Sequence, residues 1–202
     1  MSSKRFLYID TTHSLLIGLM DESYKFVEHV KILEGKSGSV VHDQINMLLS
    51  KYEIELSSLC AIFVNNGPGS YTGVRVGEGI AKIYELDGGK VISFHEHEAI
   101  QSLANSGIWV ANAFKGEFFI HKWTDNSKSE TRLVKQDFFE SDSSLDIYTN
   151  DDLLFDFNNT VHNSKDFLLK KSEIIFAKMY REELRRDTFY FRKSDEEFVI
   201  KK

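Results

Sequence analysis

The alternation of apolar and polar segments divides this chain into short strands and amphipathic helices. The first half predicts strands near residues 5–10, 14–20 and 25–32, a helix at about 39–52, a strand at 60–65, a helix at 72–87, a strand at 90–94 and a helix at 96–105. Three antiparallel strands followed by alternating helices and strands favour a mixed sheet covered by helices. The hydropathy pattern therefore predicts an α/β protein.

The helices predicted at 39–52 and 72–87 suit association with another helix. The helix at 39–52 has one clean stripe, and Val40 and Met47 widen it. The helix at 72–87 carries a line of small residues at a spacing of four, which permits close approach of another backbone. We therefore expect a partner interface built from both helices, at Val40, Val41, Ile45, Met47, Leu48, Gly73, Val74, Gly77, Ile80, Ala81 and Tyr84.

A glycine-rich turn links the strand at 60–65 to the second of these helices. The signature turn contains Gly67, Pro68, Gly69, Ser70, Thr72, Gly73 and Arg75. Pro68 presets φ, Gly69 suits the positive φ of a type II turn, and Thr72 is a good N-cap. A strand–turn–helix of this kind can present N–H groups to a phosphate, but the Gly-Lys-Ser/Thr of a P-loop is absent. A turn that seats the helix for close packing is the favoured interpretation.

Arg75 lies in the first turn of that helix, where the helix dipole disfavours a cation by ~0.3–1 kcal/mol. We therefore expect an acidic partner for it, within the chain or across an interface.

The second half of the chain is harder to place. A hairpin at 108–112 and 118–123 weakly echoes the opening strands, and residues 125–164 are polar with short elements. A long helix is predicted at about 165–186, followed by a strand at 188–192. We expect an N-terminal lobe at 1–106 and a C-terminal lobe at 107–202.

Composition limits the classes of function. Among 202 residues, 42% are hydrophobic, 28% are charged and one is a cysteine, Cys60, so an internal disulfide framework is excluded. No apolar run approaches the ~20 residues that span a bilayer, and we expect a cytoplasmic location. The net charge of −6 does not favour a nucleic-acid binder. Residues 165–193 hold nine Lys and Arg, which indicates either a solvated helix face or a basic strip.

Several motifs together carry a family resemblance. The stretch from Gly67 to Gly77 resembles the GPGSFTGLRIG-type signature of the TsaB (YeaZ) family, relatives of the threonylcarbamoyl-transferase TsaD within the actin-like ATPase superfamily. Residues 7–12 resemble the family's IDTS strand, 39–43 its HSE helix start, 110–118 its DARxGEVY hairpin and 187–192 its closing YLR. Asn112 and the triplet at 42–44 depart from the usual residues, and the C-terminal third matches weakly.

The resemblance implies a ribonuclease-H-like, actin-like fold of two lobes with a reduced C-terminal lobe. It also implies a non-catalytic subunit that activates a TsaD-like transferase, together with a TsaE-like ATPase, in forming threonylcarbamoyladenosine in tRNA. Family members pair through the two helices, so a homodimer is expected for the chain alone, with tRNA touched only indirectly or weakly. Asp10, Thr11 and Thr12 become candidates for a vestigial nucleotide site, since actin-like enzymes place a metal-binding carboxylate where Asp10 stands. A turn-stabilising role for Asp10 is the favoured interpretation.

No cofactor and no metal are expected. His95 and His97, two residues apart, are expected to point to different faces. The H-x-x-x-H metal pair of the transferase corresponds here to Glu96 and Ile100.

Two other functions remain as alternatives. A free-standing actin-like ATPase or phosphotransferase would need a glycine-rich adenosine site in the second half, but no glycine follows residue 116. A peptidase would need a nucleophile–base pair or metal ligands, and none is persuasive.

Overall fold

A computed structural model describes residues 4–32, 37–113, 115–125, 128–150 and 158–191. Its first sheet has five strands: β1 (Phe6–Asp10), β2 (Leu15–Met20), β3 (Phe26–Ile32), β4 (Ala61–Asn65) and β5 (Val91–Phe94). They lie in the order β3-β2-β1-β4-β5, with β1, β2 and β3 antiparallel and β4 and β5 parallel to β1. These strands match the sequence prediction closely.

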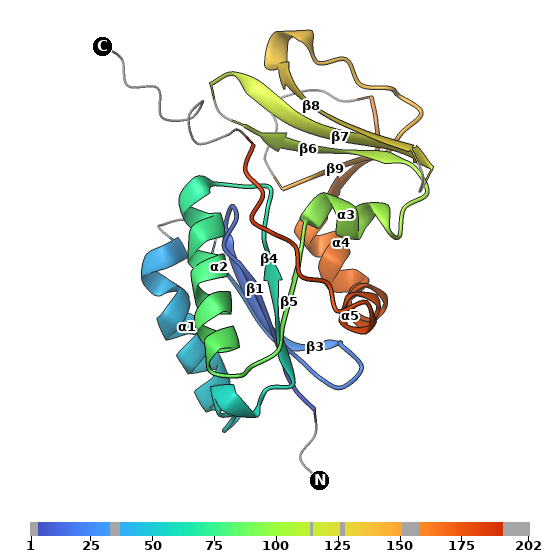
Figure 1. The fold of residues 1–202 in the computed structure, drawn as a ribbon. Coiled ribbons are helices and arrows are strands. Elements are labelled where there is room, and N and C mark those ends of the chain that lie inside the picture. Colours follow the sequence, from blue (N-terminus) through green and yellow to red (C-terminus); the bar gives the residue numbers. More distant parts are fainter. Residues whose placement is uncertain (1–3, 33–36, 114, 126–127, 151–157, 192–202) are drawn as a thin grey trace, which may run out of the picture.

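Helices cover both faces of this sheet (Figure 1). α1 (Ser37–Lys51) and α2 (Tyr71–Leu86) lie on one face, and α5 (Ser172–Arg181) lies on the other. Successive residues of β1 alternate between these faces: Leu7 and Ile9 pack toward α1 and α2, whereas Phe6 and Tyr8 pack toward α5. The 3-10 helix η1 (Leu56–Ser58) precedes β4. The sheet is therefore the middle layer of a three-layer arrangement.

The second sheet repeats the topology of the first. Its strands are β6 (Gly107–Asn112), β7 (Glu117–Asp125), β8 (Lys128–Lys135), β9 (Ile147–Thr149) and β10 (Val161–Asn163), in the order β10-β9-β6-β7-β8. β6, β7 and β8 are antiparallel, and β9 and β10 are parallel to β6 and to each other. The weak echo of the opening hairpin is thus a repeated strand order. In the chain, α3 (Glu96–Gln101) precedes β6, and the 3-10 helix η2 (Gln136–Phe138) follows β8.

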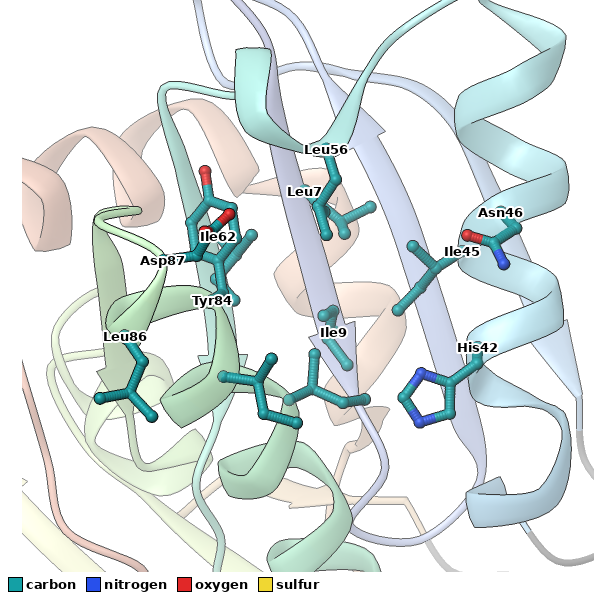
Figure 2. A pocket seen from close by; sticks show the side chains of 12 residues that line it. Leu7, Ile9, His42, Ile45, Asn46, Leu56, Ile62, Tyr84, Leu86 and Asp87 are labelled. Atoms are coloured by element: carbon teal, nitrogen blue, oxygen red, sulfur yellow. The ribbon is translucent and has the colours of Figure 1, made fainter.

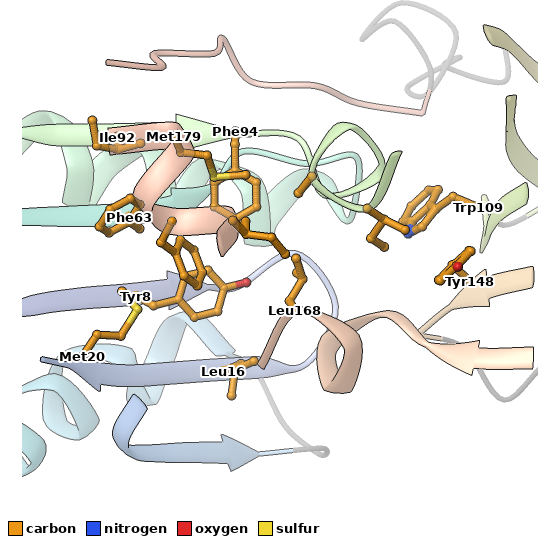
Figure 3. Packing of buried hydrophobic residues seen from close by; sticks show 14 of the residues in the cluster. Tyr8, Leu16, Met20, Phe63, Ile92, Phe94, Trp109, Tyr148, Leu168 and Met179 are labelled. Atoms are coloured by element: carbon orange, nitrogen blue, oxygen red, sulfur yellow. The ribbon is translucent and has the colours of Figure 1, made fainter. Parts of the chain in front are cut away.

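One aromatic core reaches from the first sheet to the second (Figure 3). It includes Tyr8, Phe63 and Phe94 from the first sheet, Phe176 from α5 and Trp109 from β6. The rings of Phe63 and Phe176 lie 4.9 Å apart, edge to face. α5 is therefore fixed to the first sheet even though it follows the second sheet in sequence.

The predicted helix at 165–186 is wrong as a single element. It is divided into α4 (Ser164–Lys170) and α5, because Lys171 leaves helical geometry at φ −111° and ψ 15°. This break lets α4 pack on α3 and β10 while α5 packs on β5. The chain leaves α5 through Glu183 at positive φ, and residues 184–189 then run beside the end of β5.

The helix predicted at 96–105 is also shorter, ending at Gln101. In place of the strand predicted at 188–192, the described residues show one isolated bridge, between Tyr190 and Gly69. Residue 192 lies outside the described residues.

Candidate functional site

The signature turn is held by contacts within the chain. The Gly67–Pro68 peptide is cis, Gly67 rather than Gly69 has the positive φ, at 112°, and a side chain at Gly67 would overlap the carbonyl of Phe189. Ser70, not Thr72, is the N-cap of α2, since its hydroxyl accepts from the Gly73 N–H at 3.0 Å. The N–H of Ser70 donates to the Thr12 carbonyl at 2.8 Å. These N–H groups are engaged internally, which favours the structural role of the turn over phosphate binding.

The line of small residues on α2 faces this chain's own sheet. A Cβ on Gly73 would overlap the carbonyl oxygen of Thr11, and one on Gly77 would lie 3.0 Å from the Thr11 hydroxyl and 3.3 Å from Val64. The Thr11 hydroxyl donates to the Gly73 carbonyl at 2.7 Å. The expectation that Gly73 and Gly77 form a groove for a partner is therefore wrong, because the backbone that approaches them is the turn after β1.

The other predicted interface residues divide by exposure. One group is buried in the core between α1, α2 and the sheet: Val41, Ile45, Leu48, Ala81 and Tyr84. Val74 is also buried, whereas Val40 and Ile80 are partly buried and Met47 is 65% exposed. These last three keep the most exposed surface of the predicted apolar set. Arg75 is exposed, and its guanidinium lies 4.1 Å above the Tyr71 ring. Within the described part of the chain its partner is this ring rather than the expected carboxylate.

An apolar groove does exist on the same face, between α1 and α2 (Figure 2). It has a volume of about 450 Å³, and its lining includes Ile45 and His42 from α1, Ile80 and Tyr84 from α2, and Leu56 from η1. Ile83 and Leu86, at its edge, are 68% and 88% exposed. Sequence periodicity missed these two, because they lie outside the buried stripe of α2. Their high exposure identifies this face of the molecule as a candidate binding surface.

The vestigial nucleotide-site candidates lie at the end of β1 in a buried polar cluster. The Asp10 carboxylate accepts from the N–H and the hydroxyl of Thr12 at 2.8 and 2.7 Å. The same carboxylate lies 3.2 Å from the ammonium of Lys165, and both side chains are at most 1% exposed. Burial opposes ionisation of Asp10, but the Lys165 charge and the Thr12 hydrogen bonds lower its pKa. Asp10 thus stabilises the turn, and the cation beside it is supplied by the chain.

Glu96 and two asparagines continue this cluster. The carboxylate of Glu96 accepts from Asn65 at 3.2 Å and from Asn150, in the segment after β9, at 2.6 Å. Burial and the neighbouring charge of Asp10 raise the pKa of Glu96 to about 7. The cluster thereby joins residues of both sheets. Sequence analysis missed Lys165, although a lysine in the first turn of a helix is itself an unfavourable placement.

His95 and His97 do not diverge as expected. Their rings stack with centroids 5.7 Å apart, because His95 precedes α3 in extended geometry and only His97 is helical. Glu96 points instead to Asn65 and Asn150, so the position that corresponds to one transferase ligand takes no part in this histidine cluster.

The fold and the repeated strand order define a class: an α/β protein of the ribonuclease-H-like, actin-like type. YeaZ from Pseudomonas aeruginosa is similar in structure, with a TM-score of 0.52 and 15% identity over 74% of this chain and 75% of that one. A second Pseudomonas aeruginosa structure, described as an uncharacterized protein with similarity to peptidase YEAZ, also has a TM-score of 0.52, at 17% identity and the same coverage. At this identity both comparisons show the fold.

Sequence comparison carries the resemblance further. The family described as TsaD, tRNA N6-adenosine threonylcarbamoyltransferase, matches residues 39–102. The tRNA threonylcarbamoyladenosine biosynthesis protein TsaB of Bacillus subtilis (strain 168) is 35% identical over 104 residues, which are 50% of this chain and 44% of that protein. The match thus spans less than half of that relative. The predicted resemblance to the TsaB (YeaZ) family is confirmed by these findings together. Among the described helices, none is long and apolar enough to cross a membrane.

Proposed function

We propose that this chain takes part in forming threonylcarbamoyladenosine in tRNA as a non-catalytic subunit that binds and activates a TsaD-like transferase. The name of the Bacillus subtilis relative supports the pathway. The observation that carries the subunit role is the apolar groove between α1 and α2 with exposed Ile83 and Leu86 at its edge. Exposed apolar side chains beside a groove are typical of a protein-binding surface.

The buried cluster at Asp10 supports the non-catalytic half of the proposal. An actin-like enzyme needs an open position for metal and phosphate at this carboxylate, and here the Lys165 ammonium lies against it. Moving the Lys165 ammonium away would leave the buried Asp10 carboxylate without its counter-charge, which costs several kcal/mol. We therefore propose that the chain neither hydrolyses ATP nor modifies tRNA alone, and that a TsaE-like ATPase joins the assembly. We also propose that the α1–α2 surface of this chain forms a homodimer when the chain is alone and binds the transferase in the complex. The two contacts exclude each other.

The test is association with the TsaD-like transferase of the same organism, measured by calorimetry and by size exclusion with light scattering. Ile83→Asp places a charge in the proposed interface and should weaken binding at least tenfold, about 1.4 kcal/mol. Ile174→Asp is the matched control, because Ile174 is 58% exposed on α5, on the opposite face of the sheet. Equal binding by wild type and Ile83→Asp would place the interface elsewhere.

The ATPase alternative is tested with the purified chain alone. Steady ATP hydrolysis that disappears on Asp10→Asn, while the variant remains folded, would replace the subunit role with an enzymatic one.

A further inference from the structure

Three metal-ligating side chains meet at the start of α3, away from the α1–α2 groove. His95, His97 and Glu98 each offer one ligand atom, and these three atoms all lie within 4.8 Å of one another. The Asp10 cluster uses none of these three side chains. Their convergence is unexpected for residues so close in sequence, and it depends on the change from extended to helical backbone after His95.

The tautomer of His95 follows from its hydrogen bond. Its Nε2 lies 2.9 Å from the carbonyl oxygen of Asp187, and a carbonyl only accepts, so Nε2 carries the proton and donates. In the neutral ring Nδ1 is then a lone pair, and it lies 3.7 Å from the Glu98 carboxylate. Two acceptors face each other at a distance that a cation can bridge. Ligating histidines usually donate their other N–H to a carbonyl or carboxylate, as His95 does here.

His97 supplies an independent observation. Its side chain is 6% exposed, and its Nδ1 has no hydrogen-bond partner among the described residues. A buried polar atom without a partner is unfavourable and calls for an explanation such as a missing ion. His121, whose ring centroid is 4.4 Å from that of His97, is already bonded through both nitrogens, to Thr131 and Gln101. His97 is thus held in place by packing while one of its nitrogens stays unused.

Glu98 supplies the carboxylate of the set, and its side chain is 38% exposed. Its Oε2 is the oxygen that lies 3.7 Å from the Nδ1 of His95. The Arg186 Nε donates to the same oxygen at 2.9 Å, and both side chains are partly exposed. Arg186 therefore competes with any cation for this carboxylate, and it can swing into solvent when one binds.

We propose that His95, His97 and Glu98 form a binding site for a divalent transition-metal ion, with Zn²⁺ as the best fit. Two imidazoles and one carboxylate form a ligand set that Zn²⁺ accepts, with water in the fourth position. Ligands at ~2.0–2.1 Å from a tetrahedral ion lie roughly 3.3–3.5 Å apart. The three ligand atoms already lie within 4.8 Å of one another, so small side-chain movements would bring them to this spacing. The site differs in residues from the transferase pair, which corresponds to Glu96 and Ile100.

Metal binding is measured on the untagged 202-residue chain after chelator treatment. Calorimetry with Zn²⁺ should show one ion per chain, Zn²⁺ should raise the melting temperature, and Co²⁺ should give the intense visible absorption of tetrahedral coordination. His95→Ala and Glu98→Gln change partly exposed side chains and should weaken Zn²⁺ affinity tenfold or more. Arg186→Gln should strengthen it, because the competing cation is gone. His29→Ala removes an exposed histidine of β3 and is the matched control.

Two results would overturn the proposal. One is the absence of a stoichiometric site in wild type by calorimetry and Co²⁺ absorption. The other is binding that His95→Ala and Glu98→Gln leave unchanged or that His29→Ala weakens equally, which would assign the metal to scattered surface histidines.

Discussion

The ammonium of Lys165 lies 3.2 Å from the carboxylate of Asp10, and neither side chain is more than 1% exposed. Lys165 also donates to the carbonyl and hydroxyl of Ser14, at 2.7 and 3.0 Å. Asp10 ends β1 of the first sheet, whereas Lys165 is the second residue of α4, which directly follows β10 of the second sheet. This buried pair is therefore a charged link between two distant parts of the chain.

Lys165→Met should destabilise the protein by about 3–5 kcal/mol, because it leaves the buried Asp10 carboxylate without its counter-charge. The measurement is denaturant unfolding at neutral pH. Lys170→Met is the matched control in the same helix, since Lys170 is exposed, and a change within about 0.5 kcal/mol is expected. Adding Asp10→Asn to Lys165→Met should recover part of the loss. Similar stabilities for Lys165→Met and Lys170→Met would show that the pair contributes little.

The Glu96 carboxyl should make stability depend on pH. Its pKa is raised from 4.5 to about 7 in the folded protein, so between these values the folded state binds more protons than the unfolded state. The free energy of unfolding contributed by this group is then largest below pH 4.5, falls as pH rises toward 7 and is constant above. The slope approaches about 1.4 kcal/mol per pH unit.

Glu96→Gln isolates this effect. The variant loses hydrogen-bond complementarity to Asn65 and Asn150 at every pH, but it has no proton to release. The unfolding free energy of wild type minus that of the variant should therefore fall from about pH 4.5 to 7 and stay level above pH 8. A difference that is flat across the whole range would contradict the raised pKa.

Arg185 ties the segment after α5 to α2. Its guanidinium donates to both carboxylate oxygens of Glu78 at 3.0 Å and also bonds Glu85 and Ser93. The neighbouring segment continues the attachment, since the N–H of Arg186 donates to Ser93 and that of Phe189 to Asn66.

Arg185→Gln should lower the free energy of unfolding by about 1–2 kcal/mol, a value reduced for the partial exposure of the pair. It should also speed hydrogen exchange at the N–H groups of Arg186 and Phe189. Arg185→Lys should behave similarly, because an ammonium cannot form the two-pronged contact. Arg181→Gln, an exposed change on α5, is the control. Unchanged exchange in Arg185→Gln would mean that backbone bonds alone hold the segment.

The first sheet and its helices could be predicted because their apolar periods are strong and their turns are marked by glycine or polar residues. The break at Lys171 could not, since Leu168, Ile175 and Phe176 keep a helical spacing across it and no glycine or proline signals an end. Tertiary packing on two different sheets decides that break.

The site residues divide in the same way. Asp10 could be singled out by its place at a strand end, but its partner Lys165 is 155 positions away, and local pattern carries no information on that pairing. The small residues of α2 were recognised as a site of close approach, but sequence could not say which backbone approaches. The exposure of Ile83 and Leu86 could not be predicted from the sequence, because it depends on how α2 is oriented on the sheet.

The glycines of α2 give a paired test of its packing. Gly73 and Gly79 lie in the same helix, but a Cβ at Gly73 would overlap the Thr11 carbonyl, whereas nothing lies within 4 Å of a Cβ at Gly79. Gly73→Ala should therefore push α2 away from the turn after β1 and weaken the hydrogen bond between the Thr11 hydroxyl and the Gly73 carbonyl. Overpacking of this kind costs about 1–3 kcal/mol or more.

Gly79→Ala should have the opposite sign. Alanine lowers the conformational entropy of the unfolded chain and has the higher helix propensity, so a gain of about 0.5–1 kcal/mol is expected. Denaturant unfolding of the two variants gives the comparison, and because the substitution is the same, differences in side-chain chemistry cancel. If Gly73→Ala were as stable as Gly79→Ala, α2 would not be seated on Thr11, and the line of small residues would again be available to a partner helix.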